Sequence, residues 1–278
     1  MNFPRRWGRI GGRYFGYRPD NLITNRRFMT NFLHQSIKTG NPAMNSLIQR
    51  LLPPFTTALF FLAACSAPHV DLQSGDRIIF LGDSITMQGD QPGGYVTIVR
   101  DTLTIRHPDL GLEIIGVGIG GNKVPDLQER LHRDVLSRRP NIVFVYIGIN
   151  DVWHSIKPQG GTPRDRYEAG LRSILDRITG SGARAVLCTP SVIGERYDGT
   201  NPLDTMLDEY AAASRRVARE LEIPLLDLRK AFIRYLRDHN VDNLENGILT
   251  HDGVHLGDAG NRLVAEQVLK ALGERSIR

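Results

Sequence analysis

The sequence predicts a three-layer α/β/α domain with a mostly parallel β-sheet. From Asp76 onward, short apolar runs alternate with amphipathic stretches whose apolar residues have helical spacing. The apolar runs are continuous, which indicates strands that are buried on both faces, as in a parallel sheet. Polar motifs follow several of these runs, and in open parallel sheets the functional site lies at the carboxyl ends of the strands.

Five runs are the candidate strands, and they cover residues 77–81, 113–115, 141–147, 183–189 and 223–228. The first ends in a glycine, the second leads into a glycine-rich turn, and the third is an unbroken series of mostly β-branched and aromatic residues. Six candidate helices cover residues 95–106, 124–136, 164–179, 202–221, 230–238 and 258–272. The sequence shows no internal repeat, and we expect residues 75–274 to form one domain after a linker at 66–74.

The distribution of charge argues against a nucleic-acid partner. The 278 residues have an ordinary globular composition and a formal charge of +5. Nine of the 35 basic residues and only one acid lie in residues 1–65, so residues 66–278 carry a net charge of −3. No groove-reading motif accompanies the basic residues, and we expect no binding to nucleic acid.

The basic leader contains a predicted export signal. Met44 opens a short segment that is followed by a mainly apolar stretch over residues 51–64, too short for a membrane span and typical of a signal peptide. The stretch ends in Leu-Ala-Ala-Cys, which resembles a bacterial lipobox with Cys65 as the lipidated residue. A buried N-terminal helix with an incidental cysteine is the alternative. We expect a lipid-anchored protein of the cell envelope, translated from Met44, with residues 1–43 as a mis-assigned extension.

The two cysteines do not form a disulfide framework. Cys65 is assigned to the lipid, and Cys188, which ends an apolar run, is predicted to be an inert thiol in the core. No cluster of cysteine and histidine has the spacing of metal ligands. We therefore expect no structural metal.

Ser84 is the candidate nucleophile. It follows Gly82 and Asp83 at the end of the first run, where a small residue lets the chain turn sharply off the strand. A serine at such a turn has an exposed hydroxyl and a free N–H at a helix start. A simple helix cap is an equally good interpretation of this motif alone. Ser84 is not in a G-x-S-x-G motif, so the nucleophile elbow of α/β-hydrolases is not indicated.

The glycine-rich turn after the second run has two functional interpretations. Gly116, Gly118 and Gly121 fit G-x-G-x-x-G between a strand and a helix, which indicates a dinucleotide site. The acid that such a site needs at the end of the next strand is missing, because Asp134 falls inside a helical stretch and Asp151 lies too far along the chain. Alternatively, one glycine offers its N–H to an oxyanion, or the glycines only form a tight turn.

Two further motifs supply polar groups. Asn150 follows the third run, where its neutral amide can donate to an oxyanion without losing a proton; an Asx turn is the alternative. Asp252 and His255 stand three residues apart before the last helix. With this spacing the carboxylate can fix the imidazole tautomer, while the other ring nitrogen faces a serine.

Taken in this order, the four motifs resemble the GDSL/SGNH hydrolase family. The motifs are Gly-Asp-Ser, a glycine-rich turn, Gly-x-Asn-Asp and Asp-x-x-His, and their joint occurrence is highly specific. The resemblance implies a flavodoxin-like five-stranded sheet with strand order 2-1-3-4-5. It implies a triad of Ser84, Asp252 and His255, and an oxyanion hole formed by Ser84, Gly121 and Asn150.

The chain departs from the family pattern at two positions, Gly116 where Asn is frequent and Leu256 where Pro is common. Neither departure removes a catalytic group. We expect a serine esterase that works through an acyl-enzyme and needs no cofactor. The loops at 87–94 and 153–163 are rich in Gly, Gln and Pro and have no apolar stripe, which favours short-acyl, O-acetylated carbohydrate substrates. The alternatives are a lysophospholipase or thioesterase, a nucleotide-binding protein that uses the 116–121 turn, and a non-catalytic surface lipoprotein.

Overall fold

The computed structural model describes residues 69–276. Five parallel strands form one sheet with the order β2-β1-β3-β4-β5. The strands are β1 (Arg77–Gly82), β2 (Glu113–Gly118), β3 (Ile142–Tyr146), β4 (Arg184–Cys188) and β5 (Leu225–Leu226). The parallel sheet and its strand order confirm the prediction.

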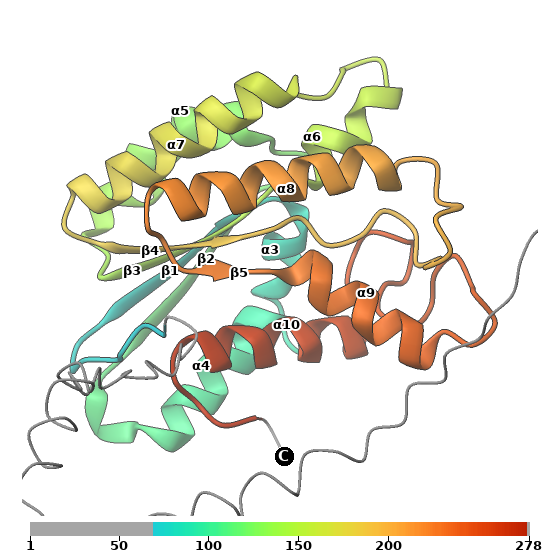
Figure 1. The fold of residues 1–278 in the computed structure, drawn as a ribbon. Helices are drawn as coiled ribbons and strands as arrows, with labels where there is room; N and C mark the ends of the chain where they lie inside the picture. Colours follow the sequence, from blue (N-terminus) through green and yellow to red (C-terminus); the bar gives the residue numbers. More distant parts are fainter. Residues whose placement is uncertain (1–68, 277–278) are drawn as a thin grey trace, which may run out of the picture. The chain divides into compact units, whose positions relative to one another are not determined.

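Helices cover both faces of the sheet and form the outer layers (Figure 1). One face carries α5 (Val124–Asp134), α7 (Arg164–Gly180) and α8 (Asp204–Glu220). The other carries α4 (Tyr95–Arg106), α9 (Leu228–His239) and α10 (Asp258–Ala271). Two short helices follow strands directly, α3 (Ser84–Gly89) after β1 and α6 (Ile149–Trp153) after β3. Short 3-10 turns complete the elements, and they are η1 (Pro108–Leu110), η2 (Leu136–Arg138) and η3 (His154–Ile156).

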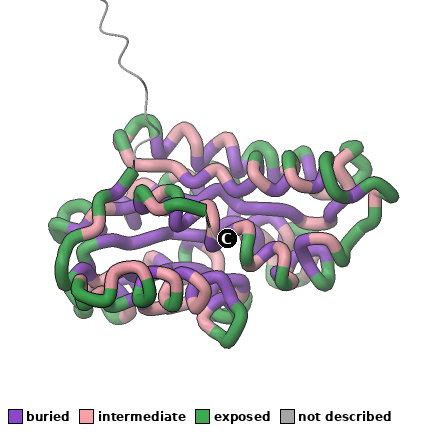
Figure 2. Tube along the Cα trace, turned by 90° about the horizontal axis from the view of Figure 1, so that it is seen from below, coloured by how far each residue is buried: buried purple, intermediate pink, exposed green. Residues whose placement is uncertain are grey.

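The sheet is buried on both faces, as its continuous apolar runs predict (Figure 2). Every residue of β3 is buried, and Phe80 of β1 stacks on Phe144 of β3 with ring centroids 4.9 Å apart. Cys188 is buried at the end of β4, and this burial raises the pKa of its thiol. The core therefore runs through the sheet and leaves its carboxyl edge for polar side chains.

β2 is longer than the sequence indicated, because Gly116 and Gly118 belong to the strand and not to the turn. A Cβ at Gly118 would lie 2.1 Å from the backbone nitrogen of Met87, and one at Gly116 would lie 2.7 Å from Cβ of Asp90. The missing side chains let α3 and the loop after it pack directly on β2. The glycines thus serve packing between a helix and a strand.

Several predictions concern residues outside the described part of the chain. They are the extension at 1–43, the start at Met44, the signal peptide at 44–65 and the lipidated Cys65. The described residues, 69–276, belong to one compact unit, which includes the predicted domain at 75–274. Between residues 69 and 276, the structure has no helix of the length and apolar character that a membrane span requires.

Candidate active site

Ser84 is the first residue of α3, directly beyond the carboxyl end of β1. The turn is tight because Gly82 has no side chain: a Cβ there would lie 2.1 Å from Oγ1 of Thr86. Asp83 caps the helix, and its carboxylate accepts the N–H of Ile85 at 2.9 Å. Asp83, and not Ser84, therefore supplies the side-chain cap of α3. This leaves the Ser84 hydroxyl available.

His255 connects Ser84 to Asp252. Its Nε2 lies 2.9 Å from Oγ of Ser84, and its Nδ1 lies 2.7 Å from Oδ2 of Asp252. Because a carboxylate only accepts hydrogen bonds, Nδ1 carries the proton, and Nε2 is free to accept the serine hydroxyl. Partial burial acts to raise the pKa of Asp252, but hydrogen bonds from the side chain and backbone of His255 outweigh it and lower the pKa. The carboxylate is thus ionised beside the imidazole.

A buried carboxylate holds the loop that carries Asp252 and His255. Glu195 is fully buried and accepts the N–H groups of Ile248 and Leu249, each at 2.8 Å, and both the N–H and the hydroxyl of Thr250. The carbonyl of Gly253 accepts the N–H of the neighbouring Gly194 at 2.8 Å. The loop is therefore fixed to the segment after β4, and these contacts hold the part of the chain that carries the His255 imidazole. Sequence reasoning missed Glu195, because nothing in its local pattern marks it as buried.

Neutral hydrogen-bond donors converge on the same edge. Residues 119–122 form a turn closed by a bond from Asn122 N–H to the Ile119 carbonyl, and Gly121 has the positive φ of +76° that favours glycine. Within the described chain, the N–H groups of Ser84 and Gly121 donate to no backbone acceptor outside regular helices and strands. Asn150 is 3% exposed, and its amide donates to the Asn122 carbonyl at 3.1 Å, which ties it to the turn. A Cβ on Gly120 would lie 4.0 Å from Cβ of Ser84, so the turn, with the Asn150 side chain bonded to it, lies beside the nucleophile.

The same region does not provide the phosphate site of a dinucleotide fold. The start of α5 is already occupied by two carboxylates, since Asp126 accepts the N–H of Lys123 at 2.7 Å and Asp151 accepts the N–H of Val124 at 3.1 Å. An anion at this helix end would compete with both. The first two glycines of the motif also pack closely, Gly118 against α3 and Gly116 against Asp90 in the loop after it.

The comparisons with known proteins show the family of the chain. The GDSL-like Lipase/Acylhydrolase family matches residues 80–263, which is more than half of the chain and includes all the side chains described above. The chain belongs to this family. It is accordingly a carboxylic ester hydrolase of the GDSL type.

Among the relatives of this GDSL hydrolase are acetylxylan esterases. The acetylxylan esterase of Geobacillus stearothermophilus is 32% identical over 221 residues, which cover 74% of this chain and 97% of the relative. The crystal structure of an acetyl xylan esterase is similar with a TM-score of 0.69 at 40% identity, and the match covers 70% of this chain and 99% of that one. Solved structures of catalytic mutants of the Geobacillus enzyme replace a serine, an aspartate and a histidine. An uncharacterized lipoprotein of Bacillus subtilis is 25% identical over 175 residues, covering 56% of this chain and 72% of that protein.

Three side chains near the triad of the GDSL hydrolase were not singled out from the sequence. The ring of Trp153 meets the ring of His255 edge to face at 6.4 Å, and Nζ of Lys157 lies 3.2 Å from the centroid of the Trp153 ring. His154 is buried beside Gly121. Burial, together with Lys157 and Lys123, lowers the pKa of His154, so its imidazole is neutral at physiological pH. An aromatic and cationic rim therefore borders one side of the site.

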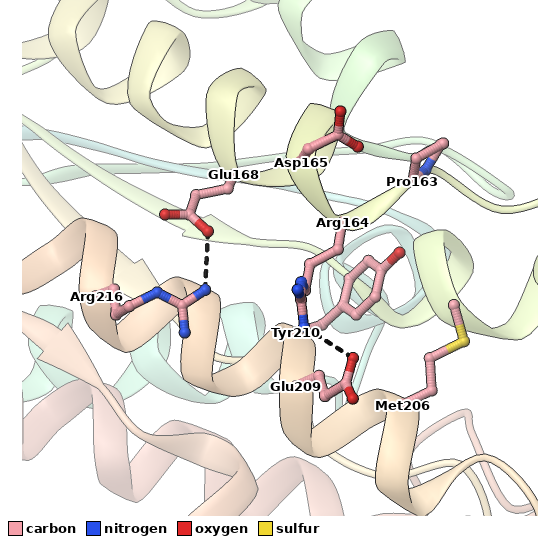
Figure 3. Close-up of a pocket in the computed structure, with 8 residues that line it drawn as sticks. All are labelled: Pro163, Arg164, Asp165, Glu168, Met206, Glu209, Tyr210 and Arg216. Carbon is pink, nitrogen blue, oxygen red and sulfur yellow. Dashed lines mark hydrogen bonds and ion pairs between the residues drawn. The ribbon is translucent and has the colours of Figure 1, made fainter.

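Among the residues the structure describes, one cluster has the composition of a metal site, formed by His251, Asp252 and His255, whose ligand atoms lie within 4.8 Å of one another. Two of its members are already bonded to each other in the triad. A hollow of about 710 Å³ lies apart from this region, between α7 and α8 (Figure 3). Its arginines pair with its glutamates, Arg164 with Glu209 at 3.0 Å and Arg216 with Glu168 at 2.8 Å. Both arginines of this hollow are thus paired within it.

Proposed function

We propose that this GDSL hydrolase is an acetylesterase that removes acetyl groups from carbohydrates. The observation that carries the proposal is the 2.9 Å approach of His255 Nε2 to Ser84 Oγ, with the other imidazole nitrogen bonded to Asp252. A serine and a histidine in this relation are arranged for nucleophilic catalysis. The acetylxylan esterases among the relatives support the choice of substrate.

The reaction has two steps. His255 accepts the proton of Ser84 as the hydroxyl oxygen attacks the acyl carbon, and Asp252 stabilises the imidazolium that forms. The N–H groups of Ser84 and Gly121 and the side-chain amide of Asn150 stabilise the tetrahedral oxyanion. The alcohol leaves with the proton from His255, and water, activated by the same imidazole, then releases the acyl group from Ser84.

The surroundings of the triad support a short acyl group on a sugar. The loops at 87–94 and 153–163 are rich in Gly, Gln and Pro and have no apolar stripe, and Trp153 provides an aromatic surface next to His255. Aromatic rings combine an apolar face with a polar edge, which suits the mixed surface of a sugar. A lysophospholipase or a long-chain thioesterase would instead need an extended apolar groove.

A substrate series tests this proposal. We expect the rate with p-nitrophenyl acetate to exceed the rate with p-nitrophenyl octanoate by at least about 100-fold, since an acyl chain longer than acetyl would find no apolar stripe in these loops. Release of acetate from acetylated xylan, absent in a Ser84→Ala variant, would support the carbohydrate assignment. A preference for octanoyl esters or for lysophospholipid would show that the long-acyl alternative is correct.

We further propose that the protein is exported and anchored to the cell envelope through a lipid on Cys65. The lipobox-like sequence and the similarity to a Bacillus lipoprotein support this proposal. Since bacterial lipoproteins carry several acyl chains, the anchor would be stable. Incorporation of radiolabelled palmitate into the wild-type chain, but not into a Cys65→Ala variant, is the expected result. Equal labelling of both chains would contradict the anchor.

The position of the first described residues fits such an anchor. The N–H of Val70 donates to the carbonyl of Ala271 at 2.8 Å. The backbone carbonyl of Asp71 accepts a hydrogen bond from the guanidinium of Arg184, the first residue of β4. These contacts lie at the amino edge of the sheet, whereas Ser84 lies beyond its carboxyl edge. Val70 follows Cys65 by five positions, so the chain between them spans at most about 18 Å. A lipid on Cys65 would leave Ser84 facing away from the membrane, toward polymers of the cell envelope.

A further inference from the structure

Arg130 of α5 is a buried arginine that extends beneath the carboxyl edge of the sheet. It is 5% exposed. Its guanidinium group donates to the Gly82 carbonyl at 2.7 Å, to the Val117 carbonyl at 2.8 Å and to Oδ1 of Asn122 at 2.7 Å. Asp134, one helical turn further along α5, forms an ion pair with Arg130 at 3.0 Å. The cation therefore contacts two strand ends and one turn at the same time.

These three acceptors belong to the segments that carry the oxyanion donors. Gly82 precedes Ser84 by two residues at the end of β1. Val117 and Asn122 lie on either side of the turn that contains Gly121. The carbonyl of Asn122 in turn accepts the Asn150 amide at 3.1 Å. One planar group thus fixes the spacing of all three donors, directly for two of them and through Asn122 for the third.

The chemistry of arginine suits this role. A guanidinium has five N–H donors in a rigid planar arrangement, whereas a lysine ammonium is a compact charge on a flexible stem. Burial lowers the pKa of Arg130, although the hydrogen bond and charge of Asp134 act in the opposite direction. Well-packed apolar residues often stabilise a protein as well as a buried ion pair does. Stability alone therefore gives little reason for a charged residue at this position.

We propose that Arg130 is a positioning residue that sets the geometry of the oxyanion hole. It touches no substrate and acts through the backbone next to Ser84 and through the turn at Gly121 and Asn122. The proposal rests on the oxyanion site described under the proposed function. Its consequence is that loss of the guanidinium reduces kcat more than it reduces substrate binding, because the oxyanion exists only in the transition state.

The test compares Arg130→Met with Arg229→Met. Arg229 is a matched control, since it is 3% exposed, donates to the Ser191 carbonyl and pairs with Asp204 and Asp208. We expect both substitutions to lower the free energy of unfolding. Only Arg130→Met is expected to reduce kcat for p-nitrophenyl acetate, by about 100-fold, with KM changed less than about threefold. Equal losses of kcat in the two variants, or none in Arg130→Met, would overturn the proposal.

If Arg130→Met does not fold, an Arg130→Lys variant is used for the test instead. It keeps the charge for Asp134 but cannot reach all three acceptors, and we expect at least about a tenfold loss of kcat. Full activity of this variant would show that a positive charge alone supports catalysis, and it would overturn the proposed role of the guanidinium. Arg130→Ala adds a further readout, because millimolar ethylguanidinium is expected to restore part of its kcat and ethylammonium is not.

A double-mutant cycle tests whether Arg130 acts through Asn150. If it does, Arg130→Met combined with Asn150→Ala loses less kcat than the product of the two single losses. Fully multiplicative losses would show that the two residues act independently and would refute that route. A wild-type protein that neither hydrolyses esters nor reacts with a fluorophosphonate at Ser84 would refute the esterase function itself, and the oxyanion role with it.

Discussion

The Nε2 atom of His255 lies 2.9 Å from Oγ of Ser84, although 171 residues separate them in the sequence. The hydroxyl is therefore ready to transfer its proton without movement of either main chain. We expect Ser84→Ala to reduce kcat for p-nitrophenyl acetate by about 10⁶-fold, because the nucleophile is lost. The free energy of unfolding, measured in urea, is expected to change by less than about 1 kcal/mol. Residual activity within tenfold of the wild type would exclude Ser84 as the nucleophile.

Asp252 determines which imidazole nitrogen carries the proton. In Asp252→Asn the side-chain oxygen can still accept the N–H groups of Val254 and His255, so the loop keeps its shape. The amide nitrogen then faces Nδ1, which favours the wrong tautomer, and we expect kcat to fall about 10⁴-fold. His251→Gln is the control, since its ring lies 3.9 Å from Asp252 without bonding to Ser84. That variant is expected to retain kcat within about threefold, and a comparable loss in both would contradict the assignment.

Asn150, just beyond the end of β3, is the proposed side-chain donor of the oxyanion hole. Its removal in Asn150→Ala is expected to reduce kcat about 100- to 1,000-fold, with little change in KM. Asn141, at the opposite end of the same strand, accepts the N–H of Arg77 and supplies the control. Asn141→Ala is expected to leave kcat unchanged. If steady-state kinetics showed a rise in KM at constant kcat for Asn150→Ala, the residue would bind substrate rather than the transition state.

Glu195 stabilises the loop that presents the triad. Glu195→Ala leaves the donors of Ile248, Leu249 and Thr250 buried without an acceptor. We expect a loss of about 3–5 kcal/mol in the free energy of unfolding, together with reduced kcat because the loop no longer holds His255. Glu245, an exposed residue paired with Arg196, is the matched control. Urea unfolding of Glu245→Ala is expected to show a change below about 1 kcal/mol, and a similar cost for both variants would argue against the role of Glu195.

Two buried carboxyls beneath the site make stability depend on pH. Burial raises the pKa of Asp83 to about 7, with a smaller contribution from the nearby Asp151, and burial raises the pKa of Asp151 to about 6. In the unfolded chain both groups titrate near pH 4. Between about pH 4 and pH 7 the folded protein therefore binds more protons, and these two groups make the free energy of unfolding fall as the pH rises.

Asp83→Asn removes most of this effect and retains a cap for α3. Relative to the wild type, we expect the variant to become progressively more stable as the pH rises through this window. The measurement is urea unfolding of both proteins at several pH values from about 4 to about 8. A difference in stability that did not vary with pH would show that folding does not shift the pKa of Asp83.

Much of the site was predictable because its motifs are local in the chain. Each depends on a short signal, such as a glycine before Ser84 or the three-residue spacing of Asp252 and His255, placed at the end of an apolar run. Parallel strands bring their carboxyl ends to one edge, so the order of motifs along the chain predicts that they meet. The extent of β2 was not predictable in this way, since only the pairing of Gly116 with Phe80 and of Gly118 with Gly82 shows that these glycines are strand residues.

The supporting residues depend on contacts that have no local signature. Arg130 follows Leu127 by three positions and thus falls near the apolar face of α5, which is a weak indication of burial. Nothing near it in the sequence indicates that its acceptors lie on Gly82, Val117 and Asn122. The same holds for Glu195, whose partners lie more than 50 residues away.

The sequence by itself determined the class of fold, the order of the strands through a family resemblance, and the identity of the groups proposed to carry the chemistry. These properties follow from hydrophobic patterning and from short motifs, which act over a few residues. The tertiary structure alone decided how the hydroxyl and the imidazole are held at hydrogen-bonding distance and how the turn at Gly121 is tied to Asn150. It also decided which groups the buried side chains of Arg130 and Glu195 contact, because a buried ionic group must find its partners wherever the folded chain places them.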